Sequence, residues 1–219
     1  MSELEKKEER MKKMIKSYSE LTLDKYYELE QLFKDDLEEI DLQVKIISLL
    51  TDLDEDDILN LPLDEYAEYV EGMSFLLTKP KTRDVRINTI ELNGEKYEIF
   101  KQPEKMTAGQ FIDYQTYLNN DLGFEYILST LLIPKGKKYG EYDVVELINK
   151  IRKYLSIQTA IDINFFFQKR LENIIRGTLI YLGWVIRNRK LPKEQKDQME
   201  TVRKKIDQMI SLLNGNGSI

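Results

Sequence analysis

RINTIELNGEKYEIF, residues 86–100, places alternating apolar and polar side chains on either side of Asn93-Gly94. Asn-Gly favours the positive φ angles of a two-residue type I′ turn, so the stretch predicts antiparallel strands near residues 85–92 and 95–101. A lone hairpin is marginal in water, and we therefore expect it to pack on helices or to add to another sheet.

Helical spacing of apolar residues marks the chain on both sides of this hairpin. Thr22 is a plausible N-cap for a helix that follows it, and the next helix carries apolar residues at spacings of three and four, which predicts a core face. These apolar residues are Leu37, Ile40, Val44, Ile47 and Leu50. The sequence predicts a mainly α fold with a small β-hairpin (α+β), in which the antiparallel hairpin joins two helical modules.

Changes in composition and helix-ending residues along the sequence predict five segments. We expect a charged N-terminal helix over 1–20, an acidic helical module over 21–80 and the hairpin over 81–103. A second helical module follows over 104–191, and residues 192–219 form an amphipathic helix with a flexible tail.

Two stretches of the chain resemble each other. LTLDKYYELEQLFKDD, residues 21–36, aligns with MTAGQFIDYQTYLNND, residues 106–121, so that Thr22 matches Thr107. An internal duplication explains the likeness, and so does chance similarity between two capped amphipathic helices; both readings stay open.

The most apolar part of the chain is SIQTAIDINFFFQKRLENIIRGTLIYLGWVI, residues 156–186. Its charged residues and glycines argue against a membrane span. We expect its large side chains to form the main core, with Trp184 substantially buried. The expected core residues are Phe165, Phe166, Phe167, Ile174, Ile175, Leu179, Leu182 and Trp184.

The 219 residues include no Cys and no His. This composition excludes imidazole bases, thiol nucleophiles, disulfides and thiolate or histidine metal sites. No pair of carboxylates stands out for catalysis, so we expect no enzyme activity and no cofactor; an oxygen-ligated magnesium site in the acidic stretch is the one enzyme reading left open.

Two segments resemble known ligand-binding loops but lack the residues or spacing that those loops require. The acidic residues from Asp52 to Asp57 suggest an EF-hand, but the sixth loop position is Asp57 instead of Gly and the twelfth is Leu63 instead of Glu. The loop PKGKKYGEY, residues 134–142, lacks the G-x-x-x-x-G-K-[ST] spacing of a phosphate loop. We therefore expect neither a calcium nor a nucleotide site.

The charge is unevenly distributed along the chain. Residues 21–78 carry 3 basic and 17 acidic residues, whereas 143–219 carry 14 basic and 8 acidic residues. A chain polarised in this way can join head to tail with copies of itself or hold a basic partner at one end. Internal neutralisation of the two halves is the alternative.

Amphipathic helices at the two ends of the chain are the candidate protein-interaction surfaces. The last helix repeats apolar residues at spacings of 3, 4, 3 and 4, which is a coiled-coil seam of two heptads and too short to be stable alone. The seam consists of Met199, Val202, Ile206, Met209 and Leu213, and the N-terminal stripe of Leu4, Met11 and Ile15.

The pattern LTDLDEDDILNLPLDEYAEYVEGMSFL, followed by LNGEKYEIF and MTAGQFIDY, resembles tail assembly chaperones from the head and tail gene modules of tailed bacteriophages. In those proteins a set such as Ile58, Leu61, Pro62, Leu63 and Tyr66 similarly links two helices. The resemblance covers about residues 20–120, and the basic part 143–219 does not match it.

The resemblance implies non-enzymatic work in virion assembly, through binding of other phage structural proteins or of further copies of the chain. It implies no cofactor, small-molecule substrate or membrane, and a location in the host cytoplasm during assembly or in the virion. The unmatched C-terminal part leaves open a structural virion component, such as a connector or packaged protein. Nucleic-acid association through Arg170, Arg176, Arg187, Arg189 and Lys190 is a further alternative.

Overall fold

The computed structural model describes residues 13–85, 87–120, 122–188 and 192–215, with the backbone alone at 188 and 208–215. Their fold is mainly α with a small antiparallel sheet, which confirms the predicted class. The chain forms two compact units. The first unit takes residues up to 83 together with 149–161, and the second takes 84–148 and the residues from 162 onward.

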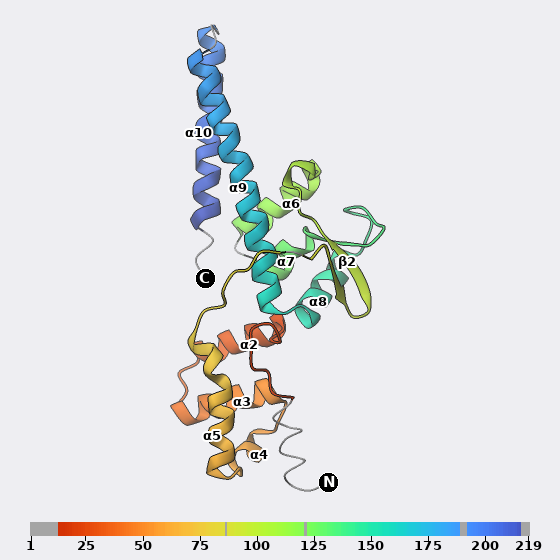
Figure 1. Ribbon diagram of the computed structural model, residues 1–219, viewed down its shortest axis with the longest axis vertical. Helices are drawn as coiled ribbons and strands as arrows, with labels where there is room; N and C mark the ends of the chain where they lie inside the picture. The colour runs from red at the N-terminus through yellow and green to blue at the C-terminus, as the bar shows by residue number, and fades with distance from the viewer. Residues whose placement is uncertain (1–12, 86, 121, 189–191, 216–219) are drawn as a thin grey trace. The chain divides into compact units, whose positions relative to one another are not determined.

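Four α-helices and a 3₁₀ turn make up most of the first unit (Figure 1). The predicted N-cap at Thr22 is confirmed, since its Oγ1 accepts a hydrogen bond from the Lys25 amide. Buried Leu23, Leu29, Val44, Ile47 and Leu50 form its centre. The helices are α2 (Leu23–Lys34), α3 (Glu39–Thr51), α4 (Glu55–Leu59) and α5 (Leu63–Gly72), followed by η1 (Met73–Leu77).

The first unit is closed by a short antiparallel bridge between segments far apart in the sequence. Thr22 pairs with Ser156, the Ile157 amide donates to the Leu21 carbonyl at 2.8 Å, and the Leu23 amide donates to the Leu155 carbonyl at 3.0 Å. The four flanking side chains are all buried. Residues 149–161, expected in the second module, therefore belong to the first unit.

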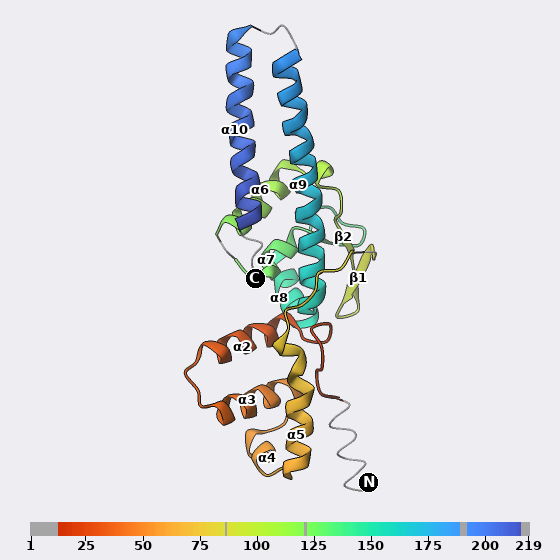
Figure 2. The ribbon, with the colours of Figure 1, turned by 60° about the vertical axis from the view of Figure 1, so that its left-hand side comes forward.

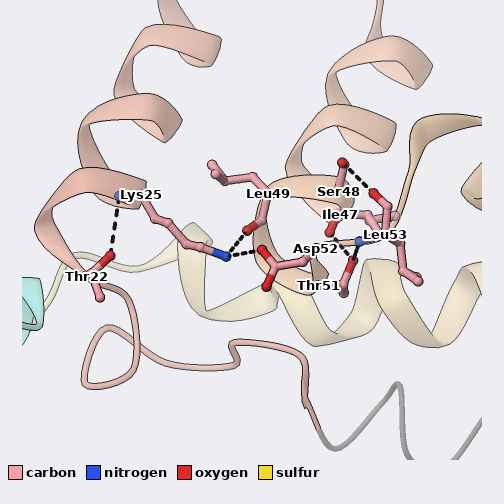
Figure 3. A network of polar contacts seen from close by, with 8 residues as sticks. All are labelled: Thr22, Lys25, Ile47, Ser48, Leu49, Thr51, Asp52 and Leu53. Carbon is pink, nitrogen blue, oxygen red and sulfur yellow. Dashed lines mark hydrogen bonds and ion pairs between the residues drawn. The ribbon is translucent and has the colours of Figure 1, made fainter. Parts of the chain in front are cut away.

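The Lys25 side chain donates a hydrogen bond to a free carbonyl at the C-terminal end of α3 (Figure 3). The Lys25 ammonium group donates to the Leu49 carbonyl and to Asp52 Oδ1, each at 2.7 Å. Asp52 ends α3 in the left-handed conformation at φ 60°, and its amide donates to the Ser48 carbonyl. The last turn of a helix leaves carbonyls without partners in the helix, and a cation placed there also complements the helix dipole.

The predicted helix over residues 1–20 is wrong for its described second part, since residues 14–20 form bends and turns. Met14 is buried, its sulfur lies in the space beside Gly72 that a β-carbon would occupy, and the Ile15 amide donates to the Leu50 carbonyl. Tertiary contacts thus replace the helical hydrogen bonds of this segment. Residues 1–12 lie outside the described residues.

The second unit contains a three-stranded antiparallel sheet in the order β1-β2-β3. Strands β1 (Thr89–Leu92) and β2 (Glu95–Ile99) form the predicted hairpin, and positive φ angles at Asn93 (52°) and Gly94 (79°) confirm the turn. Strand β3 (Leu132–Pro134) pairs with β2, so the hairpin extends into a larger sheet.

Helices pack beside this sheet in the second unit. The rings of Tyr114 and Phe167 meet edge to face with their centres 5.0 Å apart, and the buried Gln110 amide group donates to the Thr130 carbonyl at 2.7 Å. The elements are η2 (Pro103–Lys105), α6 (Ala108–Asn119), α7 (Phe124–Ser129), α8 (Val144–Tyr154), α9 (Ile157–Asn188) and α10 (Lys193–Gly215). The boundaries between the units fall within α8 and α9.

The two similar stretches of sequence have equivalent starts. Thr107 caps α6 as Thr22 caps α2, with nearly equal backbone angles, and both helices have 12 residues. The likeness therefore extends to local conformation, which either a duplication or two independent caps would produce. As for the membrane, none of the described helices combines the length and the apolar character that crossing a bilayer requires.

The Lys25 network gives a test of the α3 terminus. Replacing Lys25 with Met keeps the aliphatic stem and removes the donor to the Leu49 carbonyl, and we expect a loss of about 1 kcal/mol in the free energy of unfolding. The Asp52→Asn variant should change stability by less than about 0.5 kcal/mol, because Asp52 is largely exposed and Asn tolerates the left-handed conformation. Urea denaturation measures both changes. A greater loss of unfolding free energy in Asp52→Asn than in Lys25→Met would contradict the assignment of the stabilising contact to the Leu49 carbonyl.

Candidate protein-interaction site

The acidic run does not form a cation cage in the structure. Asp52 ends α3 and pairs with Lys25, whereas Glu55, Asp56 and Asp57 lie in the first turn of α4. Carboxylates at a helix N-terminus complement its positive end. Across the described parts of the chain, no group of three or more acidic side chains is placed to hold a metal ion.

In the loop over residues 134–142, four backbone amides donate hydrogen bonds within the chain. Amides of Lys135, Lys137 and Glu141 donate to carbonyls, and the Lys138 amide donates to the Glu141 carboxylate. Gly136 and Gly140 adopt positive φ angles that shape the loop. A phosphate cradle needs a run of successive free backbone amides, and the bonded amides of Lys135, Lys137, Lys138 and Glu141 interrupt such a run.

A group of tyrosines in the second unit is the strongest cluster of titratable side chains. The Tyr139 hydroxyl donates to Asp113 Oδ2 at 2.6 Å, and the Tyr142 hydroxyl donates to the Ser129 carbonyl at 3.2 Å. Burial raises the pKa of Tyr142 to about 12, and burial with the Asp113 carboxylate raises the pKa of Tyr139. Tyrosines with raised pKa values stay protonated, so this cluster supplies hydrogen-bond donors and no base or nucleophile.

The outer half of α9, residues 172–188, carries large apolar side chains in contact with water. Ile180 is 73% exposed, Tyr181 58% and Trp184 52%. The predicted burial of Trp184 is therefore wrong, and Phe165 and Ile174 of the predicted core are also exposed, whereas Phe167 is buried. The outer half of α9 has few neighbours to bury these side chains, and α10 runs antiparallel beside it (Figure 2).

The exposed side chains gather on one side of α9. Ile174, Gly177, Tyr181 and Trp184 follow the spacing 3, 4, 3, and Ile180 flanks them; at 100° per residue these five fall within an arc of about 120°. The adjoining strip contains buried Leu171 and Val185. We call the five residues Ile174, Gly177, Ile180, Tyr181 and Trp184 the Trp184 face.

Gly177 leaves a gap in the middle of the Trp184 face. It is exposed, and a β-carbon added there would meet no atom within 4 Å. Glycine inside a helix is less favourable than alanine by about 1 kcal/mol. None of the described residues lies close enough to require a glycine at this position.

The residues predicted for interaction divide between described and undescribed parts. Met199 and Ile206 are half-buried and Val202 is 47% exposed, all on α10. Ile15 is half-buried in the first unit. Leu4 and Met11, and the side chains of Met209 and Leu213, lie outside the described residues. The sequence does not predict the Trp184 face, because a continuous apolar run is typical of a core helix.

Basic residues outnumber acidic residues around the Trp184 face. Residues 172–207, which comprise the outer half of α9 and the neighbouring part of α10, contain nine basic and five acidic residues; Arg189 and Lys190 among them lie outside the described residues. Arg176 pairs with Glu172 four residues earlier, and Arg187 Nε donates to the Gly183 carbonyl at 3.0 Å. Arg170, at the inner end, pairs with Glu104. Basic side chains held in this way are less available to phosphates than a free cationic stripe.

The first unit carries exposed apolar side chains among acidic residues. Residues 46–78 contain nine acidic residues and no basic residue. The connection from α4 to α5, residues 59–63, exposes Leu59 by 62% and Leu63 by 83%. We call residues 54–65, with these two leucines and six carboxylates, the acidic turn. Those carboxylates form no ion pair with any other described residue.

Comparisons of the chain with protein-family models, with curated proteins and with solved structures find no match.

Trp184 is the only tryptophan of the chain, so its fluorescence reports on the Trp184 face directly. We expect iodide to quench it more strongly than caesium, because basic residues outnumber acidic residues in this part of the chain and attract the anion. Stern–Volmer titrations at low ionic strength measure both constants, with N-acetyltryptophanamide as the reference. Equal quenching by the two ions, or weak quenching by both, would contradict an exposed face in basic surroundings.

The raised pKa of Tyr142 predicts an alkaline loss of stability. The folded state keeps the phenol proton up to about pH 12, whereas the unfolded chain loses it near pH 10. Tyrosine burial therefore stabilises the fold fully below pH 10, and this contribution is lost as the pH rises from 10 to 12. Urea midpoints at pH 8 and pH 11 should differ less for Tyr142→Phe than for the native chain.

Proposed function

We propose that the chain is a non-enzymatic assembly protein of a tailed bacteriophage that works in the manner of a tail assembly chaperone. In this proposal it binds another protein of the assembly module, or a further copy of itself, through the Trp184 face, in the host cytoplasm and without a cofactor. The observation that carries the proposal is the exposure of Ile180, Tyr181 and Trp184 on one side of α9.

Exposed aromatic and aliphatic side chains are costly in a free protein and typical of binding surfaces. Aromatic residues are enriched at protein interfaces, and a helix with one apolar face suits recognition of a partner helix or groove. The resemblance of ILNLPLDEY, residues 58–66, to the helix link of tail assembly chaperones supplies the biological context of the proposal.

The basic residues favour a protein partner over nucleic acid. Arg170, Arg176 and Arg187 each make a contact within the chain, and the face between them is apolar. Nucleic-acid grooves instead present free cations beside stacking aromatic rings. A structural virion component would use the same apolar face, and the presence of the chain in purified particles would distinguish that role.

Site-specific photo-crosslinking tests the partner surface. We propose replacing Ile180 with benzoylphenylalanine and expressing the chain together with the products of its neighbouring genes. The expected result is one dominant protein adduct that mass spectrometry identifies as a component of the assembly module. Adducts should fall at least about fivefold when Trp184 is also changed to Glu, because a buried charge weakens an apolar interface.

The matched control places the same photoreactive residue at Val145 of α8, which is 68% exposed. This position should give no dominant adduct. Equal adducts from positions 180 and 145, or an adduct to nucleic acid from position 180, would overturn the proposal.

A further inference from the structure

We infer that the Trp184 face of one copy of this chain binds the acidic turn of a second copy, so that copies join head to tail. The inference rests on the proposed function, because it names a partner for the same face. It concerns contacts between two molecules, each offering one of two different surfaces.

Charge complementarity selects the second copy as the occupant. The outer half of α9 and the neighbouring helix α10, residues 172–207, contain nine basic and five acidic residues, whereas the acidic turn lies in a stretch with nine acidic and no basic residues. An acidic partner with an apolar centre suits this excess of basic charge, and residues 54–65 have both properties. Opposite charges of this kind speed association and align the two surfaces.

The apolar parts of the two surfaces also correspond. Leu63 is 83% exposed at the first position of α5, and Leu59 is 62% exposed at the end of α4. Gly177 leaves open space between Ile174 and Tyr181 on the helix of the second copy. A protruding leucine can enter such a gap and bury apolar area on both partners, which is the main favourable contribution to association.

The contact is heterologous, because the two copies use different surfaces. Each copy in such a contact keeps one free face and one free acidic turn, so the assembly continues until a ring closes or the protein becomes dilute. Exposed charges are screened by salt, and the size of the assembly should therefore fall as salt rises.

Mixing two variants tests this arrangement directly. Ile180→Glu spoils the Trp184 face and leaves the acidic turn intact, whereas Leu63→Glu spoils the acidic turn and leaves the face intact. Both positions are exposed, so neither substitution should disturb the fold. Each variant alone should be a monomer by size exclusion with light scattering, with self-association weakened at least about tenfold, whereas a mixture should form a 1:1 heterodimer that cannot grow.

Ile112→Glu is the control, because Ile112 on α6 is 61% exposed and lies in neither surface. It should assemble as the native chain does. In the mixture, Trp184 of the Leu63→Glu chain should shift its emission to shorter wavelength as the acidic turn of its partner covers it, and this shift should disappear at high salt.

Three outcomes would overturn the inference. The first is a native chain that is monomeric at both low and high salt. The second is a loss of assembly in Ile180→Glu but not in Leu63→Glu, which indicates a face-to-face dimer. The third is a mixture of the two variants that stays monomeric. Crosslinking from position 180 to a different protein, together with a monomeric native chain, would overturn head-to-tail assembly and leave the proposed function standing.

Discussion

The antiparallel bridge between Leu21–Leu23 and Leu155–Ile157 is the constraint on which the first unit depends. Thr22 and Ser156 pair with each other, Thr22 caps α2, and the Ser156 hydroxyl accepts from the Thr159 amide at the start of α9. One bridge therefore fixes the starts of two helices. Closing so long a stretch of chain costs conformational entropy, which the burial of the four flanking side chains offsets.

The sequence predicts correctly those elements that are determined by interactions between neighbouring residues. The caps at Thr22 and Thr107 and the turn at Asn93-Gly94 are chosen by side-chain hydrogen bonds and backbone preference within a few residues. Strand β3 could not be predicted in this way, because Leu132–Pro134 has only three residues and its ladder partner is β2. The bends at 14–20 likewise depend on contacts with distant residues, since Met14 packs against Gly72 of α5 and the Ile15 amide donates to the Leu50 carbonyl of α3.

The Trp184 face shows why exposure is harder to predict than secondary structure. A helix that is apolar on several sides is typical of a core, and α9 meets this expectation at Phe167 and Leu171, where other elements surround it. Farther along, the same kind of sequence has fewer neighbours, so Ile180 and Trp184 remain in water. The number of neighbours is a property of the whole fold, and no pattern within residues 173–188 carries that information.

The separation of charge and apolar surface along the chain has a consequence for how strongly copies can associate. Each of the two surfaces offers only a few large side chains, Leu59 and Leu63 on one and Ile180, Tyr181 and Trp184 on the other. A small apolar contact surrounded by solvent-exposed charges gives weak and salt-sensitive binding. Weak contacts exchange quickly, so a competing protein with a larger apolar surface can displace a neighbouring copy from the Trp184 face. In the inferred head-to-tail assembly, the neighbouring copy covers this face until the partner of the proposed function replaces it.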